Sequence, residues 1–410
     1  MTRSLGLFEG VGIELEYMIV DRSSLDVRPL SDRILRAIAG AYEPEVEVGE
    51  LAWSNELVLH VIELKTNGPA PDLSGCAALF HRDVLRINDM LEPLGAWLMP
   101  TAMHPWMDPE AESRLWPHEY NRVYEAFDRI FDCRGHGWSN LQSAHINLPF
   151  RGDGEFGRLH AAIRLALPIL PALAASSPFA NGAATGFLDT RLDFYRRNSA
   201  RVPAVTGRVI PERVFTEDEY QTRLLEPLYR DMEPFDPDGV LRYEWLNARG
   251  AIARFDRSTI EVRLLDVQEC PAADLAISAA AIALVRALVE ERWVSWEDQK
   301  RWSEDRLLRI LEAAIRDADR AAIADPEYLE SMGMPGTGTV SALGLWRSLI
   351  ARLRPSLGPE HSEALDLILR KGSLARRILR ASDGRPGSLE RVYRSMCECL
   401  AGNRMFGADV

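Results

Sequence analysis

The chain has 410 residues, of which 47% are hydrophobic and 27% are charged, and its formal net charge is -13 at pH 7. This composition is ordinary for a globular protein, and the length allows either two average domains or one large enzyme fold. The negative charge argues against a general nucleic-acid binder or a membrane-surface protein, because an anionic partner requires a basic surface.

Targeting and redox signals are weak in this sequence. The amino terminus lacks the apolar core of a signal peptide. The longest apolar run, residues 272–288, contains Asp274 and Arg286 and predicts a buried helix rather than a membrane span. The five cysteines have no second Cys or His pair nearby that would complete a zinc site, so we expect free thiols. These features predict a cytoplasmic protein.

Residues 12–21, GIELEYMIVD, predict the first strand. Side-chain alternation places Glu14 and Glu16 on one face, one pleat repeat apart, while Ile13 and Leu15 point to the other face. Two carboxylates this close require a compensating cation or a raised pKa, and a hard divalent metal suits them best. The alternative is the solvent-exposed polar face of an edge strand.

Residues 54–66 predict a second strand, which ends at the turn formed by residues 67–69. Glu63 shares its face with apolar residues and is therefore a candidate ligand, unless it only pairs with Lys65. In a regular strand Glu56 faces the opposite way, so its place in a site stays open.

Residues 76–91 predict a helix, and residues 97–105 predict a strand that runs into a turn at His104, whose role is open. Residues 139–150 then give a strand with an apolar back and a polar front, which carries Ser143, His145 and Asn147. This pattern is typical of the wall of a site. His145 is either a structural hydrogen-bonding residue or a ligand or nucleotide contact.

Residues 156–175 predict a helix that is interrupted by two prolines. The most basic part of the chain follows and contains five arginines: Arg191, Arg196, Arg197, Arg201 and Arg208. Guanidinium groups match phosphate and carboxylate geometry, so this cluster is a candidate for anion recognition; the alternative is a salt-bridged surface helix.

Residues 258–268 predict a strand with Glu261 and Arg263 on one face. The two side chains either pair with each other, or Glu261 holds a metal and Arg263 steadies the phosphate that the metal bridges.

The remainder is mostly helical, with predicted helices at 272–293, 296–318, 340–353, 361–369 and 389–400. The glycine-rich loop 333–339 lacks the Lys-Ser/Thr of a phosphate-binding loop and is read as a connector or lid. No repeat or low-complexity linker marks a boundary. We expect one catalytic domain over residues 1–410, with a sheet-bearing core at about 10–270 and a helical portion at about 271–410.

Four separated strands with acid, His or Arg on one face predict an α+β fold, with an antiparallel sheet whose concave face holds several metals and a polyphosphate. With these strands the sequence resembles the glutamate–cysteine ligase family 2, or carboxylate–amine ligases, which are related to glutamine synthetase and the guanidino kinases. The resemblance rests on residues 12–17, Glu63, residues 100–105, residues 143–147 and residues 259–268.

The resemblance implies a curved antiparallel sheet flanked by helices that binds ATP with magnesium, or alternatively manganese. The γ-phosphoryl group would pass to a carboxylate, typically the side chain of glutamate, and an amine would attack the acyl phosphate to form an amide. By matching position, the implied metal ligands are Glu14, Glu16, Glu63 and Glu261, with His145 as a metal or nucleotide contact. The implied catalytic residues are Arg263 and Glu63, and the implied nucleotide or substrate contacts are Arg196, Arg197, Asn147 and Arg263.

One departure is visible. Many family members have two histidines in the strand that carries His145, and Ser143 occupies the first of those positions here. The amine acceptor is therefore open, and two alternatives stay: a small-molecule kinase of the same fold, or a non-catalytic ATP- or metal-binding regulatory protein. We expect small-molecule partners and neither nucleic acid nor membrane, and the helix-rich carboxyl terminus leaves a homodimer open.

Overall fold

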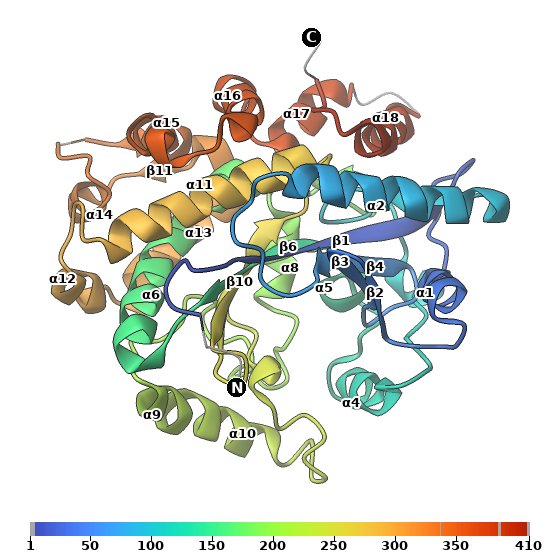
Figure 1. Ribbon diagram of the computed structural model, residues 1–410, viewed down its shortest axis with the longest axis horizontal. Helices are drawn as coiled ribbons and strands as arrows, with labels where there is room; N and C mark the ends of the chain where they lie inside the picture. Colours follow the sequence, from blue (N-terminus) through green and yellow to red (C-terminus); the bar gives the residue numbers. More distant parts are fainter. Residues whose placement is uncertain (1–4, 337, 384–386, 408–410) are drawn as a thin grey trace.

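The fold is built on one twisted antiparallel sheet, shown in the computed structural model of Figure 1, which describes residues 5–336, 338–383 and 387–407. The strand order is β2-β3-β4-β1-β6-β10-β9, and β5 pairs with the distal part of β1. The strands are β1 (Gly12–Asp21), β2 (Glu45–Val48), β3 (Leu51–Asn55), β4 (Val61–Thr66), β5 (Ala96–Met99), β6 (Ser143–Pro149), β9 (Ala251–Arg254) and β10 (Thr259–Asp266). The predicted α+β class with a large antiparallel sheet flanked by helices is confirmed.

The predicted strand over residues 54–66 is wrong, because the structure divides it into β3 and β4. The connecting residues make their backbone bonds with another segment: Leu59 N donates to Arg114 O at 2.8 Å, and Trp116 N donates to Leu57 O at 3.0 Å. Residues 57–60 are apolar enough for a strand, but tertiary pairing uses them in the connection. Glu56 therefore lies in a loop and not on the back of a strand.

One face of the sheet is covered by long helices. In Figure 1, α2 (Cys76–Leu91) and α11 (Pro271–Val289) cross above the sheet, with α6 (Gly152–Ala166) beside them. α11 has the length and apolar composition of a membrane span, but 78% of its most apolar window is buried. It is a core helix, as predicted, because it is enclosed by the sheet and the carboxyl-terminal helices.

The carboxyl-terminal helices form an outer layer on α11, α6 and α2. They are α12 (Trp296–Arg301), α13 (Glu304–Asp317), α14 (Pro326–Ser331), α15 (Ala342–Leu353), α16 (Ser362–Lys371), α17 (Leu374–Ala381) and α18 (Ser388–Gly402). The helix predicted over 296–318 is two helices, because Ser303 begins α13 by accepting a bond from Arg306 N. Helices α14 and α17 were not predicted.

The main hydrophobic core contains side chains from Val11 to Leu400, so the outer helices and the sheet share it. The division into a sheet-bearing core and a helical portion stays a prediction. All five cysteines are buried and unpaired, as predicted. Residue 337 of the glycine-rich loop lies outside the described residues.

On the opposite face of the sheet, the described residues form no such layer of long helices. In Figure 1, α4 (Asn121–Phe131), α9 (Glu217–Tyr220) and α10 (Glu226–Met232) lie below it, toward the periphery. The polar side chains predicted from strand alternation all point to this face.

Candidate active site

The strand register brings the predicted residues together on the lower face of the sheet. Across β1, Glu14 lies opposite both His145 of β6 and Lys65 of β4, and Glu16 lies opposite Glu63. On the far side of β6, Asn147 is paired with Glu261 of β10. Directly opposed residues share a face of a sheet, so four neighbouring strands contribute to one polar surface.

His145 organises the centre of this surface. Its Nδ1 lies 2.8 Å from Glu14 Oε2 and its Nε2 lies 2.8 Å from Ser143 Oγ. Asn147 donates to the other oxygen of Glu14 at 2.9 Å. Gly12 makes room for this amide, since a Cβ at position 12 would lie 3.0 Å from the Cβ of Asn147.

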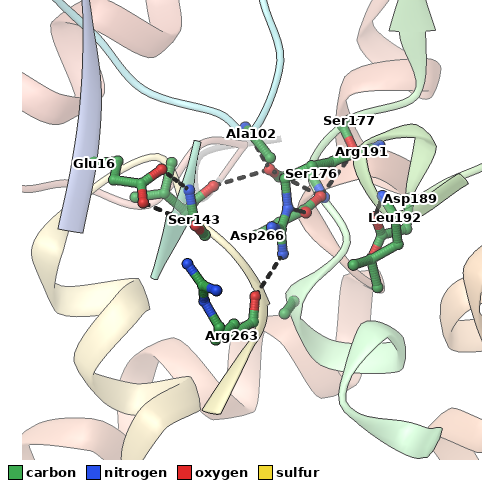
Figure 2. A network of polar contacts seen from close by, with 12 residues as sticks. Glu16, Ala102, Ser143, Ser176, Ser177, Asp189, Arg191, Leu192, Arg263 and Asp266 are labelled. Atoms are coloured by element: carbon green, nitrogen blue, oxygen red, sulfur yellow. Dashed lines mark hydrogen bonds and ion pairs between the residues drawn. The ribbon is translucent and has the colours of Figure 1, made fainter. Parts of the chain in front are cut away.

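Ser143 forms hydrogen bonds to a second carboxylate, that of Glu16. Both its backbone N and its Oγ donate to the carboxylate of Glu16, at 2.8 and 3.0 Å, as Figure 2 shows. The hydroxyl thus links His145 to Glu16 at the position where many family members have a second histidine. A smaller, neutral hydrogen-bonding group at this point leaves Glu16 oriented but not neutralised.

Glu63 is the carboxylate that two groups of potential metal ligands have in common. One group contains Glu14, Glu63 and His145, and the other contains Glu16, Glu56 and Glu63; in each, one ligand atom per residue lies within 4.8 Å of the others. Alternation could not place Glu56 in the site. The break between β3 and β4 brings it there, and no local sequence signal marks that break.

Fixed partners hold Glu63. Ser54 Oγ donates to its Oε1 at 2.6 Å, and Lys65 Nζ lies 3.3 Å from the same atom while also pairing with Glu45 at 2.6 Å. The salt bridge to Lys65, offered as the alternative reading of Glu63, is therefore present in addition to the clustering with other carboxylates.

The charges of the cluster pull the pKa values of its members apart. Burial opposes ionisation of Glu14, but the hydrogen bond and charge of His145 outweigh it and lower the pKa of Glu14 to about 2. Burial likewise opposes the charged form of His145, yet Glu14 and Glu16 raise its pKa to about 9. The Glu14–His145 pair is thus an ion pair at neutral pH.

Two further carboxylates of the cluster, Glu63 and Glu56, have raised pKa values. Burial and the charge of Glu14 raise the pKa of Glu63 to about 7. Burial together with Glu16 and Glu63 raises the pKa of Glu56 well above its usual range. More carboxylates converge here than the local cations balance, which is the condition under which a bound divalent cation stabilises a site.

Arg263 and Glu261 border the cluster on β10. Arg263 Nε lies 3.0 Å from Glu261 Oε1, an ion pair too poorly aligned to be a hydrogen bond. Glu261 Oε1 lies 3.7 Å from His145 Nδ1, so this ion pair adjoins the Glu14–His145 pair. The pairing expected as one reading of these strand neighbours is present; the other reading, in which Glu261 holds a metal and Arg263 steadies a phosphate, stays a prediction, and Glu261 belongs to neither ligand group.

A buried network behind β10 fixes the backbone at Arg263 (Figure 2). The β10–β6 register shifts between Val262 and Leu265. At this irregularity Arg191 Nη2 donates to Arg263 O at 3.2 Å, and Arg191 Nε donates to Asp266 Oδ1 at 2.5 Å. Arg191 is 2% exposed, so this member of the basic cluster is a structural residue and not a surface cation.

Asp266 is held from several sides. It accepts bonds from Ser176 N and from Ser177 Oγ, both at 2.8 Å. Burial and the charge of Asp266 raise the pKa of nearby Asp189 well above its usual range. The Arg191 guanidinium is the cation that pairs directly with Asp266 in this network.

Arg196 and Arg197 point elsewhere. Both bind the carboxylate of Asp193, and Arg196 also lies 3.1 Å from Glu312 of α13. Their predicted contact with substrate or phosphate stays a prediction. His104 is not brought to the cluster: it is buried, its Nε2 lies 2.7 Å from Leu25 O, and it has a structural role.

A pocket of about 710 Å³ opens beside Glu14, at the Gly12 end of β1. Its lining includes Asn147 and the basic side chains of Lys65 and Arg257. The carboxylates of Glu14, Glu45 and Asp256 also line it, so a polyanionic small molecule would enter this cavity together with its counter-cations.

A model of the glutamate–cysteine ligase family 2 matches residues 10–395. The chain belongs to this family. Family membership confirms the predicted resemblance and identifies the protein as an ATP-dependent carbon–nitrogen ligase.

Several relatives of this glutamate–cysteine ligase family 2 protein share much of its length. A protein of Archaeoglobus fulgidus, whose name assigns no activity, is 37% identical over 68% of this chain and 75% of its own. A Jannaschia protein provisionally named glutamate–cysteine ligase 2 is 24% identical over 95% of both chains. The glutamate–cysteine ligase of Francisella tularensis, crystallised with AMP, is 10% identical with a TM-score of 0.63, covering 98% of this chain and 90% of its own, and supports the fold alone.

Proposed function

We propose that this protein joins a carboxylate to an amine through an acyl phosphate made from ATP, and that the activated carboxylate is the side chain of glutamate. The observation that carries the proposal is the pair of ligand groups centred on Glu63, with Arg263 paired to Glu261 beside His145. Adjacent cation sites beside an arginine are the arrangement that phosphoryl transfer requires.

The residues present fit divalent cations. Carboxylate oxygens dominate both ligand groups, which favours Mg²⁺, and the nitrogen of His145 in one group also accommodates Mn²⁺. The raised pKa values of Glu56 and Glu63 support this assignment, because a cation would relieve the repulsion that raises them. Bound there, the cations would neutralise the triphosphate and polarise the transferred phosphoryl group.

The protein's own residues then position the reactants. Lys65 and Arg257 give the pocket beside Glu14 two cations for the phosphates of ATP, and the Asn147 amide lies between them and the cluster. Arg263 offsets negative charge as the γ-phosphoryl group moves to the substrate carboxylate. We assign recognition of the substrate carboxylate to Arg196 and Arg197, whose bonds to Asp193 must open for that role.

Water must be kept from an acyl phosphate, because hydrolysis would waste it. The described site faces away from the helical layer, so closure has to come from the loops on the lower face of the sheet.

The test is ADP release by purified protein with ATP and Mg²⁺ or Mn²⁺, against amino acids supplied singly and in pairs, with mass spectrometry of the products. We expect ADP release only when a carboxylate and an amine are both present, together with a conjugate lighter than its parts by one water. Glu63→Gln should abolish turnover, whereas Glu297→Gln, which changes an exposed glutamate of α12 that lies 2.8 Å from Lys300, should retain it.

A stable phosphorylated product formed without an amine would overturn the ligase proposal in favour of a kinase. ATP binding without turnover on any pair would contradict it in favour of a regulatory protein.

A further inference from the structure

A second cavity, of about 630 Å³, lies on the helical side of the sheet, away from the carboxylate cluster. Its floor is apolar and comes from β1, β6 and α11: Val11, Leu148, Ala279, Ile282 and Ala283. Its walls come from segments distant in sequence, namely residues 71–74, Phe8 and the turn at residues 356–361. In Figure 1 the connection leading into α2 passes over α11 in this region.

Three polar side chains that line this cavity lack ordinary partners among the described residues. Arg286 of α11 stacks on Phe8, with its Cζ 4.5 Å from the ring centre, and forms no ion pair with any carboxylate that the structure describes. Glu360 pairs with no arginine or lysine of the described chain, and its nearest charged neighbour is the His361 ring at 3.7 Å.

His361 is only 4% exposed, yet its ring forms no hydrogen bond with any other residue that the structure describes. Its ring nitrogens are not among the buried atoms that lack a partner, so they are accessible at the cavity surface and can form a further hydrogen bond there.

Of the other charged side chains of the lining, Glu290 and Arg292 form an ion pair, whereas Asp72 has no cationic partner among the described residues. Arg292 pairs with Glu290 at 2.6 Å, and Asp72 accepts a bond from Ser74 N at 2.7 Å. Within the described chain the cavity therefore presents one cation without an ion pair, Arg286, two carboxylates without an arginine or lysine partner, Asp72 and Glu360, and the ring of His361 above an apolar floor.

We propose that this cavity binds a free α-amino acid with an apolar side chain. The α-carboxylate would meet the Arg286 guanidinium, the ammonium would meet Glu360, and the side chain would lie on the Leu148 and Ile282 floor. His361 would complete the polar end with a hydrogen bond. A zwitterion uses charges of both signs, because its carboxylate can pair with Arg286 and its ammonium with Glu360, whereas an anion or a cation alone uses only one sign.

The position connects this cavity to the carboxylate site. Val11 and Leu148 point to the back of the sheet, and their neighbours Gly12 and Asn147 pair with each other on the front. A bound amino acid would thus touch the two strands that carry Glu14 and His145. The inference does not rest on the proposed function, because binding can be measured without ATP.

The experiment is calorimetric titration of the ATP-free protein with L-phenylalanine, 3-phenylpropionate, which lacks the ammonium, and 2-phenylethylamine, which lacks the carboxylate. L-phenylalanine, with a binding free energy per atom that is ordinary for its size, should bind with a Kd of about 1 mM. Arg286→Met should weaken L-phenylalanine at least about tenfold and leave 2-phenylethylamine unchanged. Glu360→Gln should weaken L-phenylalanine and leave 3-phenylpropionate unchanged.

Arg301→Met is the matched control, since Arg301 is an exposed arginine 2.9 Å from Asp298 outside the cavity, and it should bind L-phenylalanine normally. Arg263→Met should also bind normally; loss of binding there would place the amino acid in the carboxylate site and overturn the proposal. The proposal would also be overturned if Arg286→Met bound L-phenylalanine as tightly as the unaltered protein, or if the unaltered protein bound 3-phenylpropionate as tightly as L-phenylalanine.

Discussion

Replacing Glu63 by glutamine should stabilise the cation-free protein while removing its activity. The pKa of Glu63 is raised from 4.5 to about 7 by burial and by the charge of Glu14. A raised carboxyl pKa means that the protonated form is favoured in the folded state. The associated stability is complete below pH 4.5 and is lost as pH rises through about 7.

The magnitude follows from that shift. Glu63 is 6% exposed, so solvent screens its interactions little. A rise from 4.5 to about 7 corresponds to about 3 kcal/mol of free energy lost on ionisation at pH 8. Glutamine stays neutral and can still accept the bond from Ser54 Oγ, so Glu63→Gln should recover about 3 kcal/mol, or about 3 to 4 °C in a chain of this length.

The assay is thermal and urea unfolding in chelator at pH 8 and pH 5, with Glu45→Gln as the control that leaves both ligand groups intact. The advantage of Glu63→Gln should be large at pH 8 and should shrink toward pH 5. Adding Mg²⁺ or Mn²⁺ should stabilise the unaltered protein more than the variant, because a cation that binds only the folded state shifts unfolding by mass action. A variant less stable than the unaltered protein at pH 8 in chelator would refute the argument that these carboxylates repel one another.

Two further predictions concern buried groups outside the ligand groups. His60, whose Nε2 lies 2.8 Å from Ser139 O, has its pKa lowered to about 4 by burial, so it destabilises the fold as pH falls from 6.5 toward 4. His60→Gln keeps a donor for Ser139 O. Between pH 7 and pH 5, its free energy of unfolding should fall by about 2 kcal/mol less than that of the unaltered protein, as measured by urea unfolding. An unchanged pH dependence of this free energy would contradict the burial of His60 in its neutral form. Arg191→Lys should lower turnover by up to about a hundredfold, because it releases the carbonyl oxygen of Arg263. In a protein that already carries Arg263→Lys, adding Arg191→Lys should lower turnover little further. Fully additive losses in that double variant would show that Arg191 does not act through Arg263.

The sequence determined the composition of the site surface to a large extent. Alternation alone put Glu14 with Glu16 and put His145 with Asn147 on single faces, and the structure keeps both pairs. This works because a strand side chain has only two directions, so a buried apolar face fixes the direction of every second residue. The long helix α2 was predicted with its observed ends, residues 76 and 91.

Only the tertiary structure decided which faces meet and where a strand ends. The apolar run at residues 57–60 satisfies strand periodicity, yet its backbone pairs with residues 114–116, and this break brings Glu56 to Glu63. Arg191 belongs to a basic stretch that reads as a surface cluster, but a carboxylate 75 residues away along the chain, Asp266, accounts for its burial. Local sequence carries the direction of a side chain, whereas its partner across the fold depends on contacts between segments that no local pattern encodes.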